Sequence, residues 1–148
     1  MPDDKKKFSL VKPTINTPFH IDFDWWQVTD SNWRIFLLGF LCEKHQSFFS
    51  DKSDSLKIDA VDPETAEIHP VDGFLHTLMN HCAKMEDFIP DNLPLIGRIF
   101  RIFLANGNEP LTPQQLSEMV NKPARTILVT IGGYQVYKGI RPIQANAN

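Results

Sequence analysis

Apolar residues recur at helical spacing in three stretches of this chain. Residues 33–49 are apolar on nearly every side as far as Cys42, which is typical of a helix buried between other elements. Residues 72–84 place apolar side chains at the i, i+3, i+4 and i+7 positions of one helix face, and residues 95–105 also have one strongly apolar face. These patterns predict three helices.

Between the first two of these helices, a different pattern predicts a β-hairpin. Residues 58–61 and 67–71 are two short strand-like runs, and they flank the turn-rich sequence Asp62-Pro63-Glu64-Thr65. Pro70 cannot donate a backbone hydrogen bond, so it limits the second strand to a sheet edge. Helices together with a hairpin predict an α+β protein that is mostly helical.

The domain organisation is read from prolines and from the loss of periodicity. Residues 1–20 carry charges, Pro13, Pro18 and no periodic pattern, so we expect a flexible arm there. Pro90 and Pro94 bracket a polar pair and mark the best candidate boundary. We therefore expect a helical region with a hairpin over residues 21–90 and a second unit over residues 91–148.

Within the second unit, residues 111–143 predict a short helix, a tight turn, a second helix and a two-stranded hairpin. Thr112, followed by Pro113 and by Gln115 three residues after the cap, forms a capping-box pattern that begins the first helix. Asn121 falls at the turn, where a residue tolerant of positive φ is needed. Lys122 and Pro123 begin the second helix.

This segment resembles the winged helix-turn-helix domain of bacterial transcription regulators. With the helix over residues 95–105, the resemblance covers about a third of the chain, and the N-terminal half resembles no family that we can name. The shared features are Leu116, Val120, Asn121 at the turn, Thr126-Ile127, and the hairpin that follows Gly133.

The resemblance implies that the second helix faces the major groove of duplex DNA and that the hairpin lies near phosphates. Arg125 is the only side chain near the start of that helix able to make a bidentate contact to guanine. A single modest binding unit binds weakly, so we also expect a homodimer. The DNA-binding residues that the resemblance implies are Lys122, Ala124, Arg125, Thr126, Lys138 and Arg141.

The same helix departs from the family pattern on its outer face. Leu128 and Val129 occupy positions where recognition helices carry polar or basic side chains. Such a pair favours a protein partner or a buried face, which leaves a protein-interaction module as the alternative function. The β-branched run of residues 126–131 also leaves a strand as an alternative structure.

The charge distribution agrees with a basic end that meets nucleic acid. Residues 1–90 hold nine Lys and Arg against fifteen Asp and Glu, a net charge of −6, whereas residues 91–148 hold six against three, a net charge of +3. A surplus of three positive charges is modest for a DNA-binding protein, so this asymmetry supports the motif without standing alone.

Cysteine and histidine residues suggest a structural zinc site. Cys42 and His45 are three residues apart, which lets both side chains point one way from a helix. Cys82 and a histidine from the helix over residues 72–84 would complete four tetrahedral ligands, and His76 is the candidate for that histidine. His81 falls on the opposite flank of the helix face. Cys82 is otherwise explained as an ordinary buried thiol.

The sequence gives weaker support for a catalytic site, a cation site or an aromatic ligand site. Cys42 with His45 makes a poor catalytic pair because it follows a heavily apolar segment. The acids of residues 59–67 are explained by the hairpin turn, and Asp24-Trp25-Trp26 by core packing. No phosphate loop or nucleophile elbow appears, so we do not expect an enzyme. Without an apolar membrane-spanning run or a signal core, we expect a cytoplasmic protein with reduced cysteines.

Overall fold

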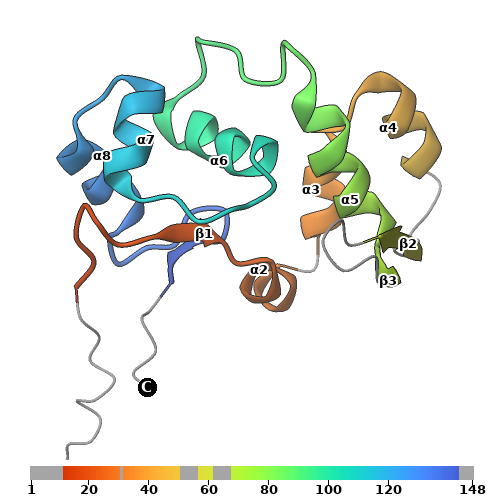
Figure 1. Ribbon diagram of the computed structural model, residues 1–148, viewed down its shortest axis with the longest axis horizontal. Coiled ribbons are helices and arrows are strands. Elements are labelled where there is room, and N and C mark those ends of the chain that lie inside the picture. Colours follow the sequence, from red (N-terminus) through yellow and green to blue (C-terminus); the bar gives the residue numbers. More distant parts are fainter. Residues whose placement is uncertain (1–11, 31, 51–56, 62–67, 144–148) are drawn as a thin grey trace, which may run out of the picture.

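The computed structural model describes residues 12–30, 32–50, 57–61 and 68–143, and there the chain is α+β and mostly helical (Figure 1). Its elements in chain order are β1 (Phe19–Ile21), α2 (Phe23–Thr29), α3 (Trp33–Leu38), α4 (Glu43–Ser50), β2 (Lys57–Val61), β3 (Ile68–Asp72), α5 (Gly73–Asn80), the 3-10 helix η1 (Cys82–Lys84), α6 (Leu95–Ala105), α7 (Pro113–Val120), α8 (Ala124–Ile131) and β4 (Ile140–Pro142).

The single helix expected over residues 33–49 is wrong, because the structure divides it into α3 and α4. The break follows Gly39, a residue with poor helix propensity, which is the C-cap of α3. The Gln46 side chain then donates a hydrogen bond to the carbonyl of Leu41 across the break, at 2.9 Å. The all-round apolar run therefore lies in α3 and in the loop of residues 39–42, and α4 begins after it with a mostly polar sequence.

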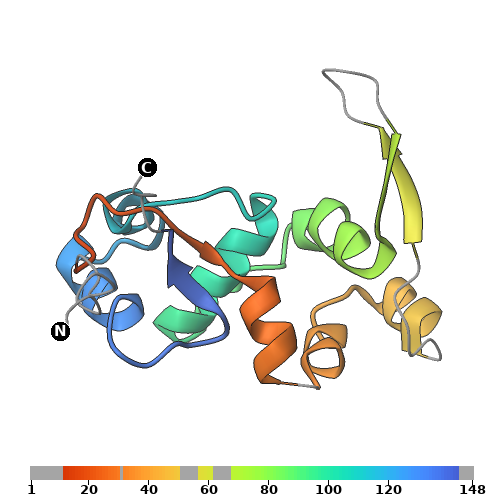
Figure 2. The same cartoon turned by 90° about the horizontal axis from the view of Figure 1, so that it is seen from below.

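The predicted β-hairpin is confirmed in the strands that the structure describes. β2 and β3 pair antiparallel, with Ile58 opposite Val71 and Asp59 opposite Pro70. This sheet has two strands, so Pro70 occupies an edge, as its missing N–H requires. The pair projects away from the helices (Figure 2), and the predicted turn over residues 62–65 lies outside the described residues.

The expected helix over residues 72–84 is shorter than predicted. α5 ends at Asn80, and His81 leaves the helical conformation with φ −128° and ψ −65° before η1 begins. Residues on either side of this break no longer follow one helical wheel. This local change decides which histidine approaches Cys82.

Aromatic side chains form the centre of the core. Trp26 on α2 is 5% exposed and meets the ring of Phe100 edge-on, with ring centroids 5.6 Å apart. Phe40, just after α3, also meets Phe100, at 5.4 Å. The tryptophan-rich segment is thus core, as expected. Segments on both sides of the proposed boundary between residues 90 and 91 share this one core.

The helices expected within residues 111–131 are present as α7 and α8. The N–H of Gln115 donates to the Thr112 hydroxyl at 3.1 Å, and the N–H of Thr112 donates to the Gln115 side-chain oxygen at 2.9 Å, which completes the capping box. Asn121 takes the left-handed conformation at φ 58°. Residues 126–131 are helical, so the strand alternative is wrong: Ile127 and Ile131 bury one helix face.

A short sheet joins the two ends of the described chain. Phe19 pairs with Pro142 and also bridges to Leu111, so β1 lies between Leu111 and β4. Phe19 is fully buried, which shows that the arm expected over residues 1–20 is too long. The predicted final hairpin keeps one bridge, Tyr137 to Ile140, around a turn with positive φ at both central residues. β4 makes its main pairing with β1.

Candidate metal centre and candidate DNA-binding face

Two of the predicted metal ligands lie at the start of α4. Cys42 directly precedes the helix, and His45 is in its first turn. Their spacing of three residues brings the Cys42 Sγ within 3.2 Å of the His45 Nδ1. The pair expected from the sequence is therefore formed.

Two more ligand atoms come from the break between α5 and η1. The Sγ of Cys82 is 3.5 Å from the Sγ of Cys42 and 3.5 Å from the Nδ1 of His45. His81, its neighbour, places Nδ1 at 3.8 Å from the Cys42 Sγ. Adjacent residues on a regular helix diverge, so both face Cys42 only because the helix ends between Asn80 and Cys82.

These four residues, Cys42, His45, His81 and Cys82, are named the Cys–His cluster below, and their ligand atoms all lie within 4.8 Å of one another. Tetrahedral Zn²⁺ with Zn–S near 2.3 Å and Zn–N near 2.0–2.1 Å implies ligand separations of about 3.8 Å for S···S and about 3.5 Å for S···N. The observed S···S separation is 3.5 Å, the three S···N separations of 3.2, 3.5 and 3.8 Å lie around the ideal value, and no pair of ligand atoms is more than 4.8 Å apart. The cluster therefore has the size of a tetrahedral metal site.

The choice of His76 as the fourth ligand is corrected to His81. His76 lies within α5 and is absent from the group of ligand atoms that converge. Its carbonyl accepts a hydrogen bond from the Asn80 side chain at 2.9 Å. On one regular helix over residues 72–84, His81 would fall on the flank away from the cluster, but the end of α5 at Asn80 turns it toward Cys42.

In the absence of a metal ion, burial is the main influence on the pKa values of Cys82 and His45. Burial, together with the side-chain contact with Cys42, raises the pKa of the Cys82 thiol to about 11, although backbone hydrogen bonds at Cys42 and Cys82 act in the opposite direction. Burial also lowers the pKa of His45 below 6.5, and His81 and Lys44 lower it further through charge repulsion. The imidazole is thereby kept in the neutral form that binds metal, whereas a thiol proton must leave when metal binds.

Some of the residues expected to bind DNA are exposed to solvent, whereas others contact residues of the same chain. Lys122, Arg125 and Thr126 are exposed at the start of α8, and Ala124 beside them is half-buried. The turn before them is held by the Ser117 hydroxyl, which donates to the carbonyl of Lys122 at 2.6 Å. This end of α8 therefore presents two cations and a hydroxyl to solvent.

The two cations of the predicted final hairpin, Lys138 and Arg141, make contacts within the chain. The Lys138 ammonium lies 4.6 Å from the centroid of the Phe36 ring. Arg141 pairs with the carboxylate of Asp22 at 3.0 Å, and Asp22 also accepts the N–H of Trp25 as the N-cap of α2. Contact of either cation with a phosphate would compete with these interactions.

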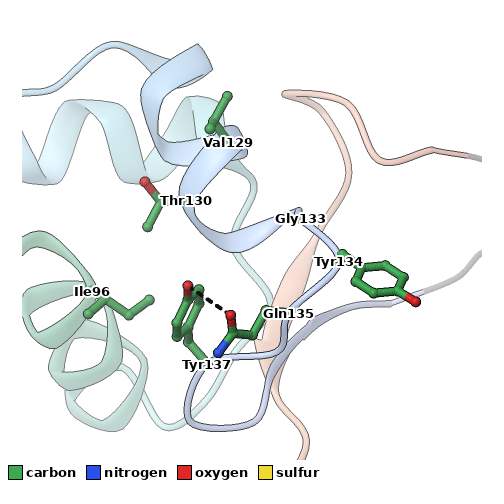
Figure 3. A pocket seen from close by; sticks show the side chains of 7 residues that line it. All are labelled: Ile96, Val129, Thr130, Gly133, Tyr134, Gln135 and Tyr137. Carbon is green, nitrogen blue, oxygen red and sulfur yellow. Dashed lines mark hydrogen bonds between the residues drawn. The ribbon is translucent and has the colours of Figure 1, made fainter.

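The apolar pair on α8 is split by the fold. Leu128 is half-buried against the core, whereas Val129 is 71% exposed. Val129 lines an open pocket of about 540 Å³ with Ile96 and Tyr137, while the ring of Tyr134 points away from it (Figure 3). Of the two side chains, Val129 is thus the one available to a partner.

No family model, curated protein or solved structure matches this chain. Within the described parts of the chain, no helix combines the length and the apolar character needed to cross a membrane.

Proposed function

We propose that the Cys–His cluster binds one Zn²⁺ ion as a structural centre. The observation that carries this proposal is the convergence of two thiols and two imidazoles within 4.8 Å. They come from two segments about forty residues apart in the chain, since Cys42 and Cys82 are separated by 40 positions. Ordinary packing does not require four such groups to meet.

The donor set favours zinc over other divalent ions. Two thiolates with two imidazoles in a tetrahedral arrangement are typical of Zn²⁺, whereas Mg²⁺ and Ca²⁺ prefer oxygen ligands. Four protein ligands leave no open coordination position for water or substrate. A structural role, rather than a catalytic one, follows from this closed ligand set.

The ion would join α4 to the segment at the end of α5. These helices lie side by side at one end of the molecule (Figures 1 and 2). The described contacts between them include the edge-on rings of Phe49 and Phe74, 5.5 Å apart. Structural zinc in small peptides contributes about 10–16 kcal/mol, comparable with the whole stability of a typical domain at about 5–15 kcal/mol.

Metal analysis of the purified full-length protein tests the zinc proposal. We expect about one equivalent of zinc per chain, and the double variant Cys42→Ser, Cys82→Ser to lose it because hydroxyls are poor zinc ligands. The matched control His76→Ala should keep its zinc, since His76 is outside the cluster. Less than about half an equivalent in the wild-type protein would contradict the proposal.

We further propose that α7, the Asn121 turn and α8 bind duplex DNA in a regulatory role, as a homodimer. The support is the exposure of Lys122, Arg125 and Thr126 together at the start of the second helix of this unit. In helix-turn-helix proteins that end of the second helix meets the base edges. Because Lys138 and Arg141 are engaged within the chain, we assign the main contacts to α8.

Salt titration of binding to random duplex DNA tests this second proposal. Affinity should fall steeply with salt, and Arg125→Ala should make the slope of log K against log salt less steep, because a cation is removed from the end of α8 that faces the DNA. Lys44→Ala removes an exposed cation on α4 and should leave the slope unchanged. Size-exclusion chromatography with light scattering would report the dimer.

Failure to bind DNA at low salt would reject the DNA proposal and favour the protein-interaction alternative. In that case Val129 and the pocket beside it would be the surface to examine, because Leu128 is half-buried. Val129→Asp should then abolish partner binding without unfolding the chain, since its side chain is exposed.

A further inference from the structure

The two cysteine sulfurs are close enough to react with each other. Cys42 and Cys82 are free thiols whose Sγ atoms are 3.5 Å apart. A disulfide bond requires about 2.05 Å between the sulfurs, so the two atoms must approach by about 1.5 Å. Cys42 is half-buried at the end of a loop, whereas Cys82 is buried.

We infer that this pair is an oxidation site, at which a peroxide converts the two thiols into a disulfide and displaces the metal ion. The displacement of metal rests on the zinc proposed above. Formation of the disulfide rests only on the distance between the two sulfurs and on the access of solvent to Cys42.

The reaction proceeds in two balanced steps. The Cys42 thiolate attacks one oxygen of hydrogen peroxide, the O–O bond breaks, and hydroxide leaves, which forms a sulfenic acid on Cys42. The Cys82 thiolate then attacks that sulfur, the S–O bond breaks, and a second hydroxide leaves. Two protons from solvent convert the hydroxides to water, so two sulfurs lose two electrons and one peroxide gains them.

The geometry assigns the order of attack. Cys42 is the half-buried and therefore more accessible residue of the pair, whereas Cys82 is 2% exposed. Cys82 is therefore the resolving thiol, which protects Cys42 from further oxidation by closing the disulfide.

Oxidation would exchange one cross-link for another. With both sulfurs in the disulfide, only His45 and His81 remain as ligands, too few to retain a tetrahedral ion. The new bond still joins the start of α4 to η1, where the metal had joined them. The redox state of the pair would thus set metal occupancy while the two segments stay connected.

Oxidation of the zinc-loaded full-length protein with one equivalent of hydrogen peroxide tests this inference. We expect one zinc ion released to a chromogenic chelator per chain oxidised, an intact mass lower by about 2 Da, and a peptide map linking Cys42 to Cys82 within one chain. A thiol reductant should restore both thiols and zinc binding. Disulfides only between chains, or sulfonic acid without a disulfide, would overturn the inference.

Parallel oxidation of the metal-free protein separates this inference from the zinc proposal. A chain that binds no zinc but forms the internal disulfide rejects the zinc proposal and supports the sulfur pairing. A chain that binds zinc but forms no internal disulfide rejects the inference alone. Cys82→Ser should leave Cys42 without a resolving thiol, so its oxidation should add oxygen instead of losing hydrogen, whereas His76→Ala should behave as wild type.

Discussion

Replacement of His81 by alanine, compared with the same replacement of His76, is the sharpest test of the candidate metal centre. Both histidines belong to the segment from α5 into η1, and only His81 joins the Cys–His cluster. His81 is exposed, so its removal opens no cavity in the core. Any large effect of His81→Ala should therefore come from the lost metal ligand.

The magnitude follows from the number of ligands. Structural zinc supplies about 10–16 kcal/mol, and an equal share among four ligands is about 2.5–4 kcal/mol for each. At 1.4 kcal/mol for each tenfold change, loss of one ligand should weaken zinc binding roughly 60- to 700-fold. His76→Ala should change the affinity by less than about threefold, or about 0.7 kcal/mol.

Competition with a chelator of known zinc affinity measures this difference, and urea unfolding checks it independently. With free zinc at about 100 times the wild-type Kd, binding stabilises the wild-type protein by about 2.7 kcal/mol, whereas a 100-fold weaker variant gains only about 0.4 kcal/mol. Equal affinities for the two variants, or a larger loss for His76→Ala, would refute the assignment of His81.

Three further predictions concern stability. Phe100→Ala should lower the free energy of unfolding by about 3–5 kcal/mol in a urea titration, because a fully buried ring at the centre of the aromatic core is lost. Thr112→Ala should cost about 1 kcal/mol in the same assay by removing the cap of α7, while Thr112→Ser should retain most of it. The pKa of His45 lies below 6.5 in the folded chain, so the unfolded state takes up its proton first as pH falls. The metal-free protein should therefore lose stability as pH falls from about 6.5 to the folded pKa of His45, and above about pH 6.5 this residue should have no effect on stability. His45→Gln should reduce this pH dependence. An unchanged profile in that variant would contradict the stated cause.

Local sequence determined those features whose interacting groups lie within a few residues of each other along the chain. The capping box at Thr112, the left-handed turn at Asn121 and the end of α6 are made by groups close together along the chain. The amphipathic face of residues 95–105 likewise defines α6 without reference to distant partners. The close pairing of Cys42 with His45 has the same local origin.

Tertiary structure decided what local patterns left open. Gly39 ends α3, but the apolar run around it does not show that two helices result, because burial on all sides erases the periodic signal. β1 is only three residues long, and its pairing with Leu111 and β4 comes from segments about ninety or more positions away. Such pairing leaves little trace in a short segment.

The candidate metal centre depends on both kinds of information. From the chain alone, Cys42, His45 and Cys82 were recognisable by residue type and spacing, because thiols and imidazoles are zinc ligands wherever they meet. The fourth ligand depended on where α5 stops. His81 faces the cluster because its backbone leaves the helix, and that departure is settled by how the segment packs, not by the helical repeat of its side chains.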